Sequence, residues 1–505
     1  ADDFLRRRPP PALERRAASK LWPLSSSIGS RAGRSRRMGV SGNPTSGVVQ
    51  QDRRWSPGHS AVPPVNLRTH LSSTALAMHP ALPRMGIFEW CIAAFLFGVA
   101  ALEATEYWYL STYIAYATLP IVLIGAMLRP IGTVVRIPVF WLMLCFLVWS
   151  YLVSTLAEEQ RLALANTWYM TKVWLVALVL AATTFQYKQV TLYLKAILLG
   201  ALVCAVIGAV LGYATARAGG ERVLGITRQP NAFGTTLFHG LLAAMILYPS
   251  TTPKWKTIIG LYVSAAFVAL LGSGSRGAAV AALTALVAYA LLEPLGHCRT
   301  RPIALLRAVA MICVPLLLAT WAFPASPLVS RIGELLEGGH GATSGRWEIY
   351  EQAWDLFRSH TMLGLGMGTF SAYSSVAYTH TTFLDLLVGG GVPAFLLYYG
   401  LYERVWKGLT RLVKTGNRTP RWRRTLNAWR SALVALIVHG AFTAVQFQKI
   451  PTYLIAMMAG FVFRYSWELS GRVRRSSQRS PARPESAGPA CDFPRHECAN
   501  VAGGS

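Results

Sequence analysis

Long apolar runs separated by short polar segments fill the chain from about residue 87 to residue 469. A helix needs about 20 residues to cross the hydrocarbon core of a membrane, and most of these runs have that length. The pattern therefore predicts an all-α, polytopic integral membrane protein with about 12 transmembrane helices. We expect these helices at residues 87–104, 108–128, 137–156, 168–186, 190–213, 232–249, 255–272, 277–293, 303–323, 382–402, 428–447 and 451–469.

One long polar insertion, at about residues 324–381, separates the ninth expected helix from the tenth. Loops of this length inside a compact domain are usually functional. The stretches "PLVSRIGELLEG" (327–338) and "SGRWEIYEQAWDLFRSH" (344–360) predict two amphipathic helices, the second with one broad apolar, aromatic-rich face. The stretch "GLGMGTF" (364–370) predicts a glycine-rich turn that permits positive φ or close backbone approach.

Composition agrees with a membrane protein. The chain is 53% hydrophobic and only 14% charged, with a mean hydropathy of +0.37, whereas soluble domains carry about 25% charged residues. The net charge of +27 comes in part from residues 1–85, which hold 14 Lys and Arg against 4 Asp and Glu. Basic segments that flank membrane spans are more simply explained as anchors for anionic lipids than as nucleic-acid-binding arms. We therefore expect membrane lipids, and no nucleic acid, as partners.

The chain divides into three parts on this pattern. Residues 1–85 are rich in Pro, Ser and Arg without apolar periodicity, which predicts a disordered basic N-terminal extension. Residues 86–470 form the transmembrane domain, and residues 471–505 have the composition of a disordered tail. The loops at 129–136, 294–301 and 403–424 are the most basic, so the positive-inside rule places them in the cytoplasm. Both termini are then cytoplasmic.

This orientation leaves a group of arginines on the outer side, against the usual charge bias. Each could snorkel to the interface or pair with a nearby glutamate. As a group they favour binding of an anionic ligand, because the guanidinium fork suits phosphate and carboxylate oxygens. These arginines are Arg217, Arg222, Arg228, Arg276, Arg331, Arg346 and Arg358.

Four stretches occur in an order that resembles the bacterial O-antigen ligase and polymerase superfamily: "TRQPNAFGTTL" (227–237), "LLGSGSRGAAVAAL" (270–283), residues 344–370, and "THTTFLDLLVGGGVPAFLLYY" (379–399). The resemblance covers about residues 87–469 and implies a GT-C-like membrane glycosyltransferase. O-antigen ligases move a polysaccharide from undecaprenyl pyrophosphate onto the lipid A–core oligosaccharide. The resemblance thus implies lipopolysaccharide biosynthesis at the periplasmic face of the bacterial inner membrane.

The same resemblance indicates the site residues. The family histidine after the outer loop falls on His380, and family arginines fall on Arg276 and Arg346, with Arg228 a further candidate. Members often place Asn after this histidine, where this chain has Thr381. An imidazole near neutral pH is the usual proton acceptor, so His380 is the expected general base for the acceptor hydroxyl. The arginines are the expected pyrophosphate clamps. We expect structural roles for the other histidines within the membrane part, His239, His340, His360 and His439.

We expect no cofactor and no metal. Asp355 and Asp385 stand alone, and Glu348 and Glu351 are more plausible as partners of neighbouring arginines than as metal ligands. An O-antigen polymerase or a protein O-oligosaccharyltransferase would use the same donor. The sequence favours a ligase over the protein transferase, but it separates a ligase poorly from a polymerase. A transporter of an anionic substrate is the alternative from another class. The sequence shows no internal repeat of the transporter type, which disfavours it.

Overall fold

A computed structural model describes most of the membrane part of the chain, and contacts assign it to the unit 81–505. The expected N-terminal extension, the expected helix at 108–128 (isolated positions apart) and Arg228 lie outside the described residues. The described ranges are 86–102, 137–184, 187–218, 229–293, 301–336, 341–374, 379–415 and 419–478, with a few isolated positions besides.

Every regular element among these residues is a helix, and each expected span that is described overlaps one, although the span expected at 428–447 is shifted from its helix, Pro420–Gly440. The last helix runs on to Gln478, past the expected domain end at residue 470. The main helices are α2 (Ile87–Leu102), α4 (Pro138–Thr155), α5 (Gln160–Thr183), α6 (Tyr187–Ala218), α7 (Pro230–Leu247), α8 (Pro253–Ser273), α9 (Arg276–Leu292), α10 (Arg301–Ala322), α14 (Thr382–Thr415), α15 (Pro420–Gly440) and α16 (Lys449–Gln478).

Six of the described helices are long and apolar enough to cross a membrane: α4, α5, α6, α7, α8 and α14. A seventh span results if α10 and α11 (Pro327–Leu336), which bend by 110° at their break, are counted as one. Helices α2 and α9 are apolar but shorter. The count of 12 spans therefore stays a prediction, whereas the all-helical architecture is confirmed for the described residues.

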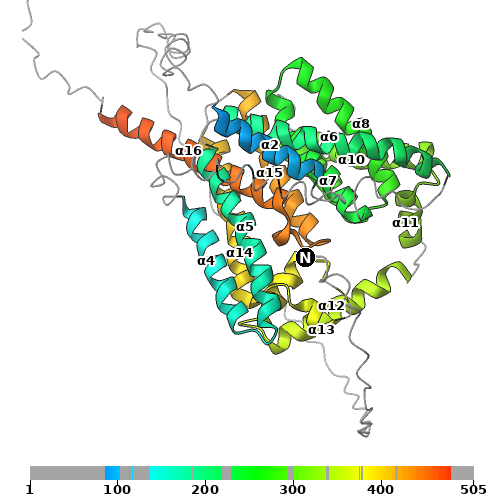
Figure 1. Cartoon of the computed structure of the whole chain (residues 1–505). Helices are drawn as coiled ribbons and strands as arrows, with labels where there is room; N and C mark the ends of the chain where they lie inside the picture. The colour runs from blue at the N-terminus through cyan, green and yellow to red at the C-terminus, as the bar shows by residue number, and fades with distance from the viewer. Residues whose placement is uncertain are drawn as a thin grey trace, which may run out of the picture. The chain divides into compact units, whose positions relative to one another are not determined.

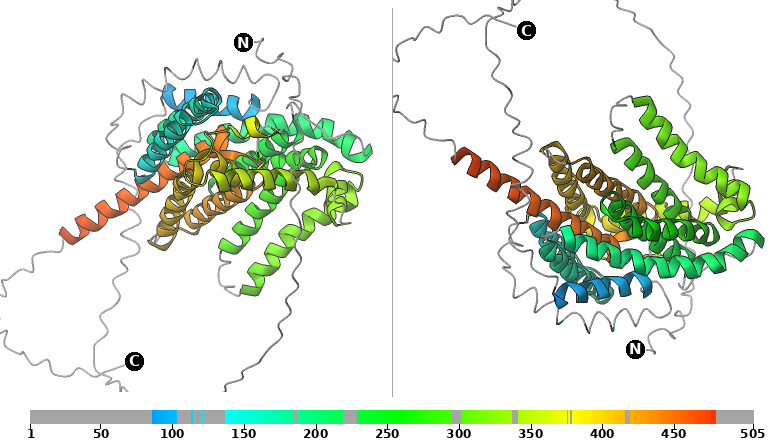
Figure 2. Two further views of the ribbon diagram at one scale, coloured as in Figure 1. Left: turned by 90° about the horizontal axis from the view of Figure 1, so that it is seen from below. Right: turned by 90° about the horizontal axis from the view of Figure 1, so that it is seen from above.

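The helices pack in two neighbouring groups (Figures 1 and 2). In one group α14 lies along α4, and α16 packs against α5; in the other, α6 contacts α2, α7 and α8. Rings of Phe146, Trp174 and Tyr398 meet at centroid distances of 5.4 to 6.3 Å where α4, α5 and α14 join. Helix α15 packs on α9, α14 and α7, and so connects the groups.

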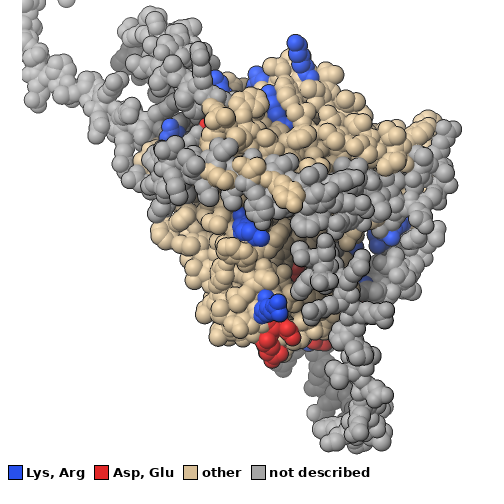
Figure 3. Space-filling view, in the orientation of Figure 1, with Lys and Arg blue, Asp and Glu red and all other residues tan. Residues whose placement is uncertain are grey.

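Several helix ends and the turns beside them lie together at one end of the bundle. Arg421, at the start of α15, donates to the carbonyl oxygen of Pro249 at 2.8 Å, and Arg424 contacts Glu293 at 3.1 Å. Tyr187, which begins α6, bonds to Ser250. Figure 3 shows several Lys and Arg side chains at the end where α7 and α8 meet, and acidic side chains at the opposite end, by the α4–α5 turn. The positive-inside rule predicts that the basic end faces the cytoplasm, and this orientation stays a prediction.

The insertion after α10 folds into three short helices: α11, α12 (Gly341–Ser359) and α13 (Phe370–Tyr373). The two amphipathic helices are thus confirmed as helices. The broad apolar face expected for the second is only partly buried. Ala353 and Phe357 are buried in a cluster with α14, and Ile349 packs on it, whereas Trp347 and Trp354 are exposed. The two parts of the face adjoin each other where the ring centroids of Trp354 and Phe357 lie 5.2 Å apart.

The glycine-rich turn is confirmed and fits a kink in α14. Gly364, Gly366 and Gly368 all have positive φ, at 70°, 103° and 69°. In α14 the helix breaks at Gly391, with φ 67° and ψ −171°, where a Cβ would collide with the Met362 carbonyl.

The carbonyl groups that the kink frees find donors on neighbouring elements. Leu365 N–H donates to the Val388 oxygen at 2.7 Å, and Gly366 N–H to that of Gly389 at 2.9 Å. Trp149 Nε1 on α4 donates to the Gly390 oxygen at 2.7 Å. A broken helix is tolerated at membrane depth when protein groups satisfy its backbone in this way. The turn therefore fixes the insertion after α10 to the first part of α14, next to its kink.

Candidate functional site

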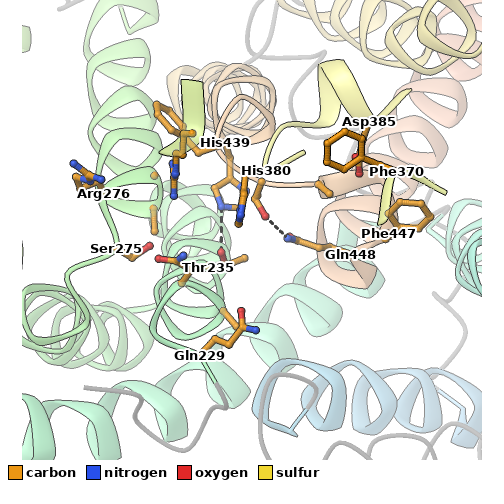
Figure 4. Close-up of a pocket in the computed structure, with 18 of the residues that line it drawn as sticks. Gln229, Thr235, Ser275, Arg276, Phe370, His380, Asp385, His439, Phe447 and Gln448 are labelled. Atoms are coloured by element: carbon orange, nitrogen blue, oxygen red, sulfur yellow. Dashed lines mark hydrogen bonds between the residues drawn. The ribbon is translucent and has the colours of Figure 1, made fainter. Parts of the chain in front are cut away.

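A cavity of about 410 Å³ opens at the end of the bundle opposite the Arg421 contacts (Figure 4). Helices α7, α9 and α14 all begin at this cavity: Gln229, Ser275 and His380 lie on its wall, just before their first turns. The free N–H groups and the positive dipole end of a helix N-terminus favour bound anions. Three such termini around one cavity make it suited to a negatively charged ligand.

Three arginines reinforce this charge. Arg276, the first residue of α9, and Arg331 and Arg346, on α11 and α12, line the cavity. The only carboxylate among its described lining residues is Asp385. In Figure 4, Arg276 lies on one side of the cavity, and Asp385 and Phe447 lie on the other. Guanidinium groups bind phosphate oxygens in pairs and stay charged at any relevant pH.

His380 occupies an unusual backbone conformation on the cavity wall. Its φ is 60°, and no other non-glycine residue among those described has a positive φ. This conformation costs about 1–3 kcal/mol and persists only where neighbouring groups enforce it. The residue is half-buried. Such local strain gathers at functional sites, so the backbone points independently to the position that the resemblance indicates.

Hydrogen bonds to Asp385 hold the turn in which His380 has its positive φ. Its buried carboxylate accepts bonds from Thr379 Oγ1 at 2.9 Å and Thr379 N–H at 3.3 Å, and from Gln446 Nε2 at 3.0 Å. The same Thr379 hydroxyl proton is shared with the Thr381 carbonyl oxygen, 2.8 Å from Thr379 Oγ1, which closes the turn around His380. Thr381 Oγ1 accepts from Phe383 N–H at 3.3 Å as the N-cap of α14. The threonine that replaces the family's Asn is therefore a helix cap and part of the turn.

The cavity shifts the pKa of His380 downward. Partial burial disfavours the charged imidazolium, and the nearby Arg346 guanidinium repels it further. The imidazole is therefore neutral, and able to accept a proton, at pH values where an ordinary histidine with a pKa near 6.5 is half protonated. This is the state that a general base needs.

The lowered pKa of His380 predicts how the transfer rate depends on pH. A base fails when it is protonated, so kcat/KM should fall on the acid side below about pH 6.5, the ordinary imidazole value. Replacing Arg346 with glutamine removes one repelling charge, raises the pKa of His380, and should move the acid limb to higher pH. Arg331→Gln removes another cavity arginine and is the matched control, which we expect to leave the limb in place. A limb that stays fixed in Arg346→Gln would contradict this account of the shift.

A second histidine, His439, also lies on the cavity wall. It is buried, and its Nε2 lies 3.2 Å from Thr235 Oγ1 on α7, a contact drawn in Figure 4. Its Nδ1 makes no hydrogen bond to the described residues. The ring packs on Phe238 at a centroid distance of 4.7 Å. The structural role expected for it stays a prediction, and its place on the cavity wall was not expected from the sequence.

One comparison with known protein families gives a match. Residues 261–399 match the family model described as O-antigen ligase. This match supports a relationship of that part of the chain to the O-antigen ligase and polymerase superfamily. No match was found among curated proteins. The superfamily's members are membrane glycosyltransferases and ligases, and the match together with the apolar helices supports a membrane protein of glycosyltransferase type.

The superfamily match spans three of the four residues that the sequence indicated. Arg276, Arg346 and His380 lie within 261–399, and the cavity brings all three together. Arg228 lies outside both the match and the described residues, although its neighbour Gln229 lines the cavity. The sequence predicts Arg331 as one of the outer-side arginines but not as a site residue, whereas the structure places it on the cavity wall. The available signal was its position in the amphipathic stretch before α12, on the membrane side predicted for the other arginines.

Proposed function

We propose that this member of the superfamily is an O-antigen ligase. It transfers O-antigen polysaccharide from undecaprenyl pyrophosphate to the lipid A–core oligosaccharide in lipopolysaccharide biosynthesis. The supporting observation is the joint presence of His380, Arg276 and Arg346 around one cavity. These residues are separated by up to 104 positions in the sequence and come from three different elements.

The transfer assigns one task to each kind of residue. His380 accepts the proton of an acceptor hydroxyl as that oxygen bonds to the anomeric carbon of the donor sugar. The bond between that carbon and the pyrophosphate oxygen breaks, and undecaprenyl pyrophosphate leaves with its electron pair. Arg276 and Arg346, with Arg331 and Arg228 as further candidates, stabilise the charge that develops on the pyrophosphate. The protonated His380 then releases its proton to water.

We further propose that the reaction needs no metal or cofactor. The donor already carries a good leaving group, and arginines can neutralise its charge in place of a divalent ion. Among the described residues, His, Cys, Asp and Glu do not form a group of three that could hold a metal. Transfer that is unchanged by a chelator supports this proposal. Loss on chelation, with recovery on adding a divalent ion, would contradict it.

The site is proposed to face the periplasm of a bacterial inner membrane, with both termini in the cytoplasm. The basic end of the bundle, where Arg421 and Arg424 lie, would then face the cytoplasm. Accessibility labelling of single cysteines in cells tests this. A cysteine at Gln160, at the start of α5, should react with an impermeant reagent, and one at Thr251, in the opposite turn, should not.

A deletion strain separates the ligase from its nearest alternatives. A strain that lacks a ligase accumulates lipid-linked polymer and leaves the lipid A–core unmodified. A strain that lacks a polymerase attaches single repeats to the lipid A–core, and loss of a protein O-oligosaccharyltransferase leaves lipopolysaccharide unchanged. We expect the first pattern, with complementation by the wild-type chain. Either of the other patterns would contradict the ligase assignment while leaving the superfamily assignment intact.

A further inference from the structure

A second hollow lies on the insertion between α10 and α14. It is beside the cavity lined by Arg276, Arg331 and Arg346, which we call the arginine cavity. It measures about 430 Å³ and is lined by Trp347, Tyr350, Glu351 and Trp354 of α12 together with Thr381, Leu384 and Ala441. We call these seven residues the aromatic groove. Three aromatic rings and one carboxylate therefore face a concave surface, whereas the arginine cavity is lined by cations.

The groove uses the part of the α12 apolar face that packing leaves open. Its four α12 residues follow the spacing i, i+3, i+4 and i+7, which places them on one side of the helix. The adjoining part of the face, with Ala353 and Phe357, is already buried against α14, and the ring centroids of Trp354 and Phe357 lie 5.2 Å apart. Trp347 is 70% exposed and Trp354 41% exposed. Large rings left open beside a surface that is already packed indicate a binding surface.

The groove and the arginine cavity share their dividing wall. Along α12, Arg346 lines the cavity and the next residue, Trp347, lines the groove. At the start of α14, His380 lines the cavity and Thr381 lines the groove. A ligand in the groove therefore contacts residues that directly follow the proposed base, His380, and one proposed phosphate clamp, Arg346, in the sequence.

We propose that the aromatic groove binds the sugar rings of the acceptor, the lipid A–core oligosaccharide. This inference rests on the proposed function. Flat aromatic rings offer apolar area to the C–H faces of a pyranose, and the Glu351 carboxylate and Thr381 can hydrogen-bond to its hydroxyl groups. Glu351 disfavours the anionic pyrophosphate of the donor. The sugar that approaches the general base from this side is therefore the acceptor.

The alternative occupant is the bilayer, since Trp and Tyr also collect at membrane interfaces. Two features disfavour it. An interfacial helix presents a convex apolar face with charges on the opposite side, whereas this surface is hollow. Glu351 lines this surface with the rings, and the Arg358 guanidinium lies 5.6 Å from the centroid of the Trp354 ring, so inserting this face into hydrocarbon would bury two charged groups. A site with a few polar groups among aromatic walls is instead typical of a small-molecule pocket.

Binding of lipid-free core oligosaccharide to the purified full-length protein in detergent, measured by calorimetry, tests the proposal without needing catalysis. We expect Trp347→Ala and Trp354→Ala each to raise Kd by about five- to tenfold, the effect of losing one aromatic contact. Glu351→Gln should raise it less. Trp321→Ala, which removes an exposed ring on α10 outside the groove, is the matched control and should leave Kd unchanged.

Further arms separate the occupants and the two proposals. His380→Ala, which should lose transfer, should still bind the core oligosaccharide, because binding and catalysis use different residues. Binding of lipid-free O-polysaccharide in place of the core would overturn the acceptor assignment. If neither saccharide binds, and Trp354→Ala only weakens association with phosphatidylethanolamine–phosphatidylglycerol vesicles, the groove is a bilayer anchor and this inference fails. The proposed function would stand in that case if the variants transferred glycan with an unchanged KM for acceptor.

Discussion

Replacing His380 with alanine should lower kcat for glycan transfer by about 10²- to 10⁴-fold, the usual contribution of a general base. Binding of the lipid-linked donor should change little, because the arginines that hold its pyrophosphate remain. The measurement is the single-turnover rate with purified protein in lipid vesicles, together with donor Kd. His360→Ala is the matched control, since His360 is exposed at the end of α12 and does not line the cavity.

A second variant separates the role of the imidazole from the role of the backbone. His380 has a φ of 60°, a region that asparagine adopts several-fold more readily than most residues. His380→Asn should therefore keep the turn that Thr379 and Asp385 hold, yet lack a base. We expect it to be as slow as the alanine variant. If the asparagine variant transfers at the wild-type rate, His380 is a conformational residue and the general-base proposal is wrong.

Replacing Arg276 with alanine should lower kcat by about 10²- to 10³-fold, as expected when one preorganised group loses its contact with the charge of the transition state. Arg276→Lys keeps the charge but loses the planar fork, so its loss should be intermediate. Arg161→Ala removes an exposed arginine at the same end of the bundle, near the acidic α4–α5 turn, and should be neutral. Unaltered transfer in Arg276→Ala, with donor both saturating and limiting, would refute the clamp.

Local features of the outer loop could be predicted from sequence because they depend on neighbouring residues. The run Gly364, Gly366 and Gly368 predicts positive φ, and all three have it. The apolar periodicity of the two loop helices also predicts helices near the observed bounds. What it could not show is which part of the broad apolar face of α12 is buried and which part stays exposed, because a helical period gives no indication of which neighbour the face will meet.

Convergence of the site depends on tertiary packing, which local sequence does not encode. Arg276 and His380 come together only because α9 and α14 both pack on α15. Asp385 reads as an isolated carboxylate in an apolar run, and its partners Thr379 and Gln446 are identified by the structure alone. The kink at Gly391 is hidden in the same run, since three consecutive glycines are equally compatible with close helix packing.

The proposed function leaves a clear division of labour on the outer face. Under that proposal, arginines and helix N-termini hold the departing pyrophosphate, a strained turn presents the base, and an aromatic groove on the other side of the wall receives the acceptor sugar. If both substrates are lipids whose head groups reach this depth, as proposed, the place of His380 at the start of a membrane helix is explained.

Reconstitution tests the central claim most directly. The purified chain is placed in vesicles with undecaprenyl-pyrophosphate-linked O-antigen and lipid A–core, with no added metal, and products are separated by gel. The account predicts that polysaccharide appears on lipid A–core at a rate that His380→Asn abolishes and His360→Ala preserves. If the chain instead lengthens the lipid-linked glycan, or transfers none with both substrates present, the ligase assignment is contradicted.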